Sequence, residues 1–415
     1  MRYFRPTRRI SRSSRRQATT DWVHTHDEAP TVTRKPFLVV LLPGPIYDLK
    51  DRFAEPLELL SRSFDGIVLT SSSSTRTEQF GSFVVRTTAL EDAGISRHFR
   101  FLAHVFRSVR ECLRSGRRPS VVTTYDPLIT GIVGWLVARW TGAVLIPEVN
   151  GDYTAWENHL SPTGRRRHVR RAVLLAIEGF VLRRADAVKL QFDQQIAYFG
   201  DHTPKRRMHL FNYVNLRGFH DARAESPPYV ILFVGYPLEV KGLDVLIEAF
   251  KRVHGAAPEW RLKIIGWYPD RSALDAHVDG HAAIDVSDPV RHDLIATEMA
   301  NCRIFVLPSR TEGIARVLME SAAVGVARIA TRVGGTATVV ADGIDGLLVE
   351  PGNVESLAAA LLRLMTDGGL RDRLGAAAAL RARTEFTAAA YAEKIADFYQ
   401  DLLDARAANT TVTGK

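Results

Sequence analysis

The chain has 415 residues, of which 46% are hydrophobic and 24% are charged. This length exceeds the roughly 250 to 300 residues at which a single hydrophobic core stops growing, so two domains are expected, and the composition excludes a disordered chain. The net charge is +9, but residues 1–35 hold nine Arg or Lys against three acids, so this segment carries +6 and the rest only +3 (9 − 6 = 3). We interpret residues 1–35 as a basic flexible tail, and we expect no nucleic-acid partner because the nearly neutral body lacks interleaved basic and aromatic residues.

The first half of the chain alternates short apolar runs with longer amphipathic stretches, which indicates βαβ units and a parallel sheet. Continuous apolar runs favour strands that are covered on both faces. Residues 36–212 are therefore predicted to form a doubly wound, Rossmann-like α/β domain. Its expected strands are Phe37–Leu42, Gly66–Thr70, Phe83–Thr87, Val121–Thr124, Val144–Val149 and Val188–Gln191.

The same pattern restarts after Ser226-Pro227-Pro228, so residues 213–228 are predicted to be a linker and residues 229–384 a second Rossmann-like domain. From Asn353 to about Ala405 the sequence predicts two or three helices. We assign residues 385–406 to a separate C-terminal helix and residues 407–415 to a short tail. The expected strands of the second domain are Tyr229–Val234, Arg261–Ile265, Ala283–Val286, Arg303–Leu307, Ala327–Ala330 and Gly346–Val349.

A candidate binding site follows the strand Arg303–Leu307. The chain continues with Pro-Ser-Arg-Thr-Glu-Gly and a predicted helix, Ile314–Val324, which Gly325 closes. Ligands of open parallel sheets bind at the carboxyl ends of the strands, where a helix N-terminus attracts anions such as a nucleotide diphosphate. Residues of the loop and helix start are expected to contact this ligand: Ser309, Gly313, Ile314 and Ala315.

Two acidic residues flank this helix start. Glu312 lies in the loop, where it would stand beside a sugar, and Glu320 lies about two turns along, where it could accept hydrogen bonds from a ribose diol. The alternative is that both are exposed surface acids. The ordered context of strand, Pro-Ser, Glu-Gly, helix, Glu and Gly favours the binding site.

The segment Pro308–Gly325, PSRTEGIARVLMESAAVG, resembles the Glu-x7-Glu signature of the large retaining glycosyltransferase family that includes sucrose synthase and many bacterial cell-envelope sugar transferases. The stretches ILFVGYPLEVKGLDVLIEAFKRV, WRLKIIG and VGGTATVVADGIDGLLVEPGN resemble the same family. The resemblance implies a GT-B fold, in which two Rossmann-like domains face across a cleft and the C-terminal helix packs back on the first domain. It also implies a nucleotide-sugar substrate, no cofactor, no metal, and transfer with retention.

Individual residues follow from the resemblance. Lys241 matches the lysine that neutralises the donor phosphates and, with Glu312, would take part in the chemistry. Tyr236 stands where an arginine that also holds the diphosphate is usual, and Thr338 and Ala327 replace a common glutamate and proline. Gly44 resembles a glycine loop near the phosphates, although an ordinary turn explains it as well.

The first domain is expected to hold the acceptor. Asn150 stands near the position of a histidine that is close to the transferred sugar in the family, and it would act there by hydrogen bonding alone. Glu148 or Asp152 could contact acceptor hydroxyls, or be plain loop residues. The basic segment Gly164–Arg171 precedes an apolar face, so it could dock on anionic lipid or grip a lipid diphosphate, or be a solvated face.

The sequence thus predicts a glycosyltransferase that moves a sugar from a nucleotide sugar to a glycan or lipid-linked acceptor in cell-envelope polysaccharide synthesis. The alternative is a non-catalytic nucleotide-binding relative, which the departures at Tyr236, Asn150 and Thr338 suggest. Without a signal-peptide pattern or an unbroken apolar span, we expect a cytoplasmic protein that associates peripherally with the inner face of the membrane. Cys112 and Cys302 are expected to be buried thiols.

Overall fold

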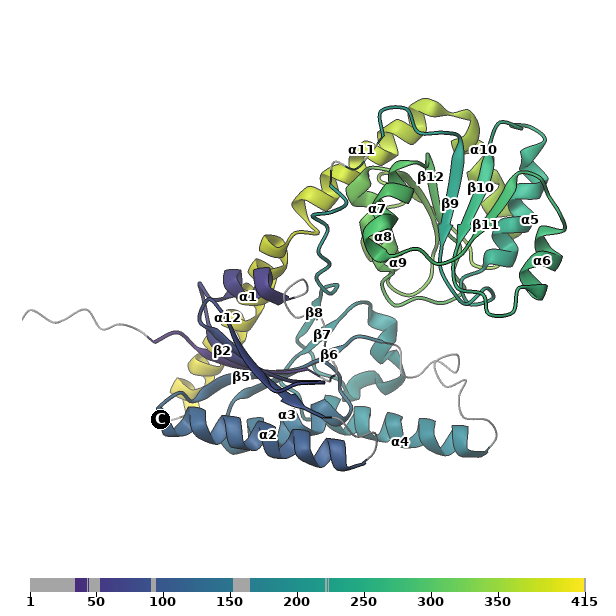
Figure 1. The fold of residues 1–415 in the computed structure, drawn as a ribbon. Coiled ribbons are helices and arrows are strands. Elements are labelled where there is room, and N and C mark those ends of the chain that lie inside the picture. Colours follow the sequence, from purple (N-terminus) through teal and green to yellow (C-terminus); the bar gives the residue numbers. More distant parts are fainter. Residues whose placement is uncertain are drawn as a thin grey trace, which may run out of the picture. The chain divides into compact units, whose positions relative to one another are not determined.

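The computed structural model describes residues 34–42, 44, 53–90, 95–151, 165–220, 222 and 224–413. The predicted tail lies outside these residues except for Arg34 and Lys35, as do Pro43, Pro45, Asp152 and Gly164. Among the described residues, two sheets of eight and six strands form two Rossmann-like domains, which confirms the predicted fold class (Figure 1).

The first sheet has the order β3-β4-β2-β1-β5-β6-β7-β8, and every neighbouring pair is parallel except β3 and β4. Six of its strands match the predicted ones. The other two, β3 and β8, were not predicted. The bounds are β1 Phe37–Leu41, β2 Asp65–Ser72, β3 Arg76–Phe80, β4 Phe83–Ala89, β5 Pro119–Thr124, β6 Val144–Val149, β7 Val188–Leu190 and β8 Arg207–His209.

Helices cover both faces of this sheet, so its central strands are buried on both sides. In β1, Phe37, Val39 and Leu41 pack on the side of α2 and α3, whereas Leu38 packs on the side of α1 and α12 (Figure 1). The helices are α1 Glu55–Leu60, α2 Ile95–Arg114, α3 Ile129–Thr141, α4 Arg165–Leu182 and the 3₁₀ helix η3 Asp193–His202.

The second sheet is entirely parallel and has the order β11-β10-β9-β12-β13-β14. Numbered from β9, this is the strand order 3-2-1-4-5-6 of a dinucleotide-binding domain, and its direction reverses between β9 and β12. All six strands were predicted. Their bounds are β9 Val230–Val234, β10 Arg261–Ile265, β11 Ile284–Ser287, β12 Ile304–Leu307, β13 Ala327–Thr331 and β14 Leu347–Val349.

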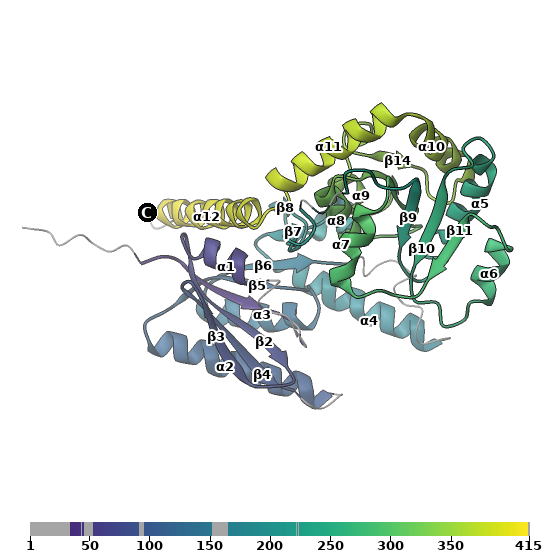
Figure 2. The same cartoon turned by 45° about the horizontal axis from the view of Figure 1, so that its top comes forward.

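The helices of the second domain also lie on both faces of the sheet, with α10 against α5 and α11 against α8 (Figure 2). Their apolar faces and the sheet form one continuous core that includes Trp260, Phe233 and Phe305. The bounds are α5 Leu243–His254, α6 Ser272–Val278, α7 His292–Ala300, α8 Arg316–Val324, α9 Thr336–Val339, α10 Val354–Thr366 and α11 Gly368–Thr384.

The last helix, α12 (Ala388–Thr413), returns to the first domain. Ile395, Tyr399 and Leu402 are buried in the core that β1, β2 and α1 form, and the Tyr399 ring lies edge-on to Phe64 at 6.3 Å between centroids. The predicted packing of the C-terminal helix on the first domain is therefore confirmed. The helix continues to Thr413, beyond the expected end at residue 406.

Candidate active site

The loops after β9 and β12 meet at the point where the strand order of the second sheet reverses. Lys241 lies in the first loop and Glu312 in the second, and the Lys241 ammonium donates a hydrogen bond to Glu312 Oε1. Ser309 Oγ donates to the same carboxylate oxygen at 2.9 Å. The Glu312 side chain is only 9% exposed and that of Lys241 23%. Neither residue is thus a freely solvated surface charge, and the structure brings these three predicted residues together.

Two glycines allow neighbouring segments of the backbone to lie close to the loop after β12. Gly242 has φ 65°, and a Cβ there would lie 2.0 Å from the carbonyl oxygen of Pro308. Gly334 has φ 50°, and a Cβ there would lie 1.8 Å from the carbonyl oxygen of Glu312. Both positions combine a left-handed backbone with a backbone contact, so only glycine fits.

Helix α8 begins at Arg316, two residues after the predicted start, because Ala315 has an extended backbone. Gly325 closes the helix in the left-handed conformation, as predicted. Glu320 is 2% exposed, and its Oε1 lies 2.9 Å from His292 Nε2 and 3.8 Å from the Arg316 guanidinium. Glu320 is therefore not an exposed helix acid. His292, at the start of α7, is a site residue that the sequence analysis missed.

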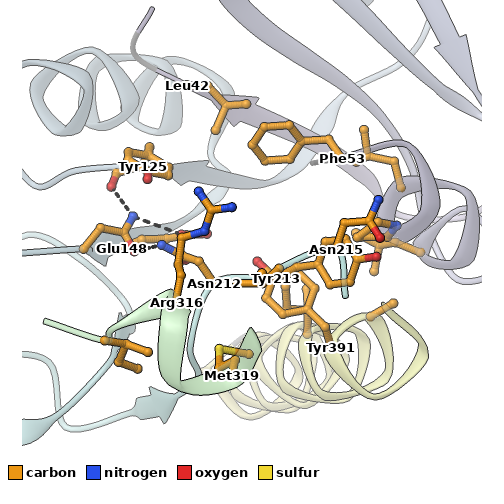
Figure 3. A pocket seen from close by; sticks show the side chains of 18 of the residues that line it. Leu42, Phe53, Tyr125, Glu148, Asn212, Tyr213, Asn215, Arg316, Met319 and Tyr391 are labelled. Atoms are coloured by element: carbon orange, nitrogen blue, oxygen red, sulfur yellow. Dashed lines mark hydrogen bonds between the residues drawn. The ribbon is translucent and has the colours of Figure 1, made fainter. Parts of the chain in front are cut away.

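A cavity of about 1170 Å³ lies next to this constellation. Its lining includes Asn150, Gly313 and Ile314 from the predicted site, together with His292 and Arg316. Glu148, a predicted acceptor contact, lines it as well. Seven other predicted residues do not: Lys241, Glu312, Ser309, Ala315, Glu320, Tyr236 and Gly44. Glu312 nevertheless immediately precedes the lining residue Gly313. Figure 3 shows Arg316 rising from α8 into the cavity, with Glu148 and Asn212 on the wall that the first domain provides.

A buried lysine stands behind that wall. Lys189 is 1% exposed, and its ammonium donates to Glu148 Oε2 at 2.9 Å, Asn212 Oδ1 at 3.2 Å and the Tyr391 hydroxyl at 3.0 Å. Burial is the largest single influence on the pKa of Lys189 and lowers it, but Glu148 and Tyr391 together, through charge and hydrogen bonds to the ammonium, outweigh burial. The pKa therefore lies above its usual value and the lysine stays charged. Because Tyr391 belongs to α12, this network also fastens the C-terminal helix to the cavity wall.

Asn150 belongs to the same network. Its Nδ2 donates to the Tyr125 carbonyl oxygen at 2.6 Å and lies 3.4 Å from Glu148 Oε2, while its Oδ1 accepts from Asn212 Nδ2 at 2.9 Å. The amide orientation is thus set by three neighbours. The predicted catalytic role of Asn150 stays a prediction, and any contact it makes with a ligand would come from a fixed amide.

Tyr236 provides no cation at the end of β9. Its ring is 44% exposed and lies edge-on to Trp267 and Tyr268, at 5.2 and 6.1 Å between centroids. Tyr268 in turn donates from its hydroxyl to the Gly235 carbonyl oxygen at 2.8 Å. Arg310 is close in sequence to Glu312, but it is held by Asp244 through bonds of 2.7 and 2.6 Å. The cations that contact the two predicted glutamates are Lys241, which bonds to Glu312, and Arg316, whose guanidinium lies 3.8 Å from Glu320.

Gly44 has a structural explanation. A Cβ at this position would lie 1.7 Å from Ser71 Oγ and 2.4 Å from the Ser71 carbonyl oxygen, so the glycine allows the chain to pass close to β2 after β1. Its predicted contact with donor phosphates stays a prediction.

Helix α4 contains the predicted basic segment from Arg165 onward. Val169 and Val173 are 58% and 52% exposed, and Arg170 between them is also exposed. The helix therefore presents apolar and basic side chains together.

None of the helices in the part of the chain that the structure describes has the length and apolar character to cross a membrane. Cys112 and Cys302 are buried free thiols, as predicted.

The arrangement of two Rossmann-like domains with a returning C-terminal helix is the GT-B fold. Sucrose-phosphate synthase from Thermosynechococcus elongatus shares it with a TM-score of 0.66 and 21% identity, over 90% of this chain and 100% of that one.

The second domain carries the family relationship. Residues 228–367 match the family described as glycosyl transferases group 1.

Curated relatives match over part of their length. An uncharacterized glycosyltransferase of Methanocaldococcus jannaschii is 35% identical over 146 residues, which are 35% of this chain and 40% of that protein. An exopolysaccharide phosphotransferase of Streptomyces coelicolor is 34% identical over 171 residues, which are 40% of this chain and 18% of that protein. The chain thus spans less than half of the length of either relative.

Proposed function

We propose that this chain is a glycosyltransferase that moves a sugar from a nucleoside-diphosphate sugar to a hydroxyl group of its acceptor, with retention at the anomeric carbon. The observation that carries the proposal is the Lys241–Glu312 pair at the reversal point of the second sheet, where α/β domains of this strand order bind nucleotides. The match of residues 228–367 to the group 1 glycosyl transferases supports it.

The proposed donor site uses the loops described above. The diphosphate would lie at the N-terminus of α8, whose free N–H groups and dipole favour an anion. Glu320 would accept hydrogen bonds from the ribose, because its buried carboxylate is fixed by His292 and has a second oxygen to offer. Glu312 would orient the sugar, held in place by Ser309 and Lys241.

In the proposed reaction, the bond between the anomeric carbon and the diphosphate oxygen breaks, and the acceptor hydroxyl oxygen bonds to the same carbon from the same face. The hydroxyl proton passes to the departing phosphate oxygen. Lys241 and the α8 amides stabilise the negative charge that grows on the diphosphate. These groups supply positive charge without a metal, so we expect a chelator such as EDTA to leave the rate unchanged.

The acceptor is proposed to be a glycan or a lipid-linked saccharide in cell-envelope polysaccharide synthesis. The exopolysaccharide relative and the mixed basic and apolar surface of α4 support this choice. We propose that α4 rests on the anionic inner surface of the cytoplasmic membrane, which would bring such an acceptor to the cavity.

Turnover of nucleotide sugars tests the proposal. With a panel of nucleotide sugars and lipid-linked acceptors, Lys241→Ala is expected to reduce the rate of nucleotide release about 100-fold or more, the cost of removing one group that stabilises transition-state charge. Lys251→Ala, on the exposed end of α5, is the matched control and should keep full activity. An active Lys241→Ala variant would contradict the proposed role.

A second candidate is a nucleotide-binding relative without transferase activity. It is favoured by Tyr236, which adds no second cation to Lys241 in the loop after β9, and by the fully engaged amide of Asn150. Calorimetry distinguishes the two, because this candidate binds nucleotide but releases no product from any donor and acceptor pair in the panel.

A further inference from the structure

Gln191 is the residue that follows β7 directly, and it is 6% exposed. Its backbone is fixed by Gln195, whose Oε1 accepts from the N–H groups of Gln191 and Phe192 at 2.7 and 3.2 Å. Gln195 Nε2 in turn donates to the Val149 carbonyl oxygen at 2.9 Å, which ties this turn to β6. The position of Gln191 is therefore well defined by the first domain.

The side chain of Gln191 is not satisfied in the same way. Among the residues described by the structure, no donor reaches Gln191 Oε1, and this oxygen is buried. Buried polar atoms nearly always have a hydrogen-bond partner, and an orphaned one destabilises the fold. Gln191 lines the 1170 Å³ cavity, so a ligand in the cavity could supply the missing donor.

Three other polar side chains of the cavity wall, Asn150, Asn212 and Glu148, do have partners within the protein. Asn150 and Asn212 bond to each other, and Glu148 Oε2 and Asn212 Oδ1 accept from Lys189. These groups hold the wall together. Gln191 is the amide in this described wall whose oxygen is left without a partner.

The side chain faces the donor loop of the second domain. A Cβ on Gly313 would lie 3.2 Å from Gln191 Oε1, so the amide oxygen lies against the backbone that follows Glu312. Under the proposed function, this loop flanks the sugar of the nucleotide sugar. The oxygen accepts hydrogen bonds, and sugar hydroxyl groups donate them.

We propose that Gln191 is a specificity-determining residue that accepts a hydrogen bond from a hydroxyl group of the transferred sugar. This inference rests on the proposed function and adds to it a contact from the first domain to the donor. A site that is built to accept from one hydroxyl rejects analogues that lack it, because the buried oxygen then stays unpaired.

Binding measurements with matched ligand pairs test this contact. The probes are UDP with UDP-glucose, ADP with ADP-glucose and GDP with GDP-mannose, each titrated into wild type, Gln191→Met and Gln191→Ala. For the pair that the wild type binds, both variants are expected to keep the Kd of the free nucleotide and to weaken that of the nucleotide sugar about 5- to 15-fold, the effect of one hydrogen bond. Gln194→Ala, on the exposed surface of η3, is the matched control and should bind both ligands like wild type.

Two further measurements separate recognition from a structural role. Gln191→Met removes an unsatisfied polar group but fills its volume, so the ligand-free variant should melt at the same or a higher temperature than wild type. A structural role would lower the melting temperature. Deoxy analogues of the bound sugar identify the hydroxyl, because wild type and Gln191→Met should bind the correct deoxy donor equally well.

The outcomes distinguish the two proposals. If wild type binds a nucleotide sugar and Gln191→Met binds it equally tightly, the contact is refuted and the proposed function stands. An equal loss for nucleotide and nucleotide sugar also refutes the contact. If wild type binds none of the six probes, the proposed donor site fails, and the role of Gln191 fails with it.

Discussion

Replacing the buried lysine behind the cavity wall gives a quantitative test of the first domain. In Lys189→Met the hydrocarbon chain keeps a similar length, but the ammonium that bonds Glu148, Asn212 and Tyr391 is lost. The Glu148 side chain is only 12% exposed, so its charge is left with little solvent and without its counterion. Removing one partner of a buried ion pair costs about 3–5 kcal/mol, and we expect a loss of that size in the free energy of unfolding.

Urea denaturation followed by circular dichroism measures this loss. The double variant Lys189→Met/Glu148→Leu is the control, because it removes the stranded charge and should lose less stability than Lys189→Met alone. A loss below about 1 kcal/mol in Lys189→Met, or a double variant that simply adds the two single losses, would refute the view that the ammonium and carboxylate form a coupled buried pair.

Three further predictions concern backbone strain, pH and the C-terminal helix. Gly242→Ala should lower the free energy of unfolding by about 2 kcal/mol or more and impair donor binding, because φ is 65° and the added Cβ would lie 2.0 Å from a carbonyl oxygen. Gly255→Ala, at the other end of α5, places its Cβ in open space and should leave stability unchanged. Burial lowers the pKa of His104, and the unfolded chain therefore takes up the proton first as the pH falls. Stability should then decrease as the pH falls below about 6.5. Urea titrations should show a smaller decrease in His104→Gln than in wild type. The control His277→Gln, at an exposed position, should show the same decrease as wild type. Tyr399→Ala should cost about 3–5 kcal/mol by leaving a cavity where α12 packs on the first domain, and a thermal melt unchanged from wild type would contradict that packing.

The strands were predictable from the sequence wherever a continuous run of apolar residues marked them. Runs such as Phe37–Leu41 are apolar on both faces, which favours strands inside a covered sheet. The two missed strands carry no such signal. In β3 only Phe80 is buried, and the other residues are polar. Strand β8 has three residues, of which the first and last are exposed. These strands form because each pairs with a neighbouring strand, β3 with β4 and β8 with β7, and not because of a strong pattern of their own.

The site was predictable only in part, because some of its contacts join elements that are far apart in the sequence. The loop from Pro308 to Gly313 and helix α8 are contiguous in sequence, so their order predicted Glu312 and Glu320 together. His292 reaches Glu320 from a helix that begins 28 residues earlier, and Tyr391 reaches Lys189 from 202 residues away. Nothing in the local pattern around His292 or Tyr391 indicates these partners, because each contact depends on how separate elements pack.

The charges around the donor loop have a consequence for the proposed reaction. Lys241 is already bonded to Glu312, and Arg316 lies near Glu320, so the ligand-free site carries nearly balanced charge. A diphosphate that enters must share Lys241 with Glu312, and Ser309 keeps a hydrogen bond on the carboxylate while it does so. Since Tyr236 is not a cation, Arg316 and the free N–H groups at the start of α8 have to hold a larger part of the diphosphate charge. The geometry of the loop that Gly242 and Gly334 permit is then as important for the donor as the charged side chains themselves.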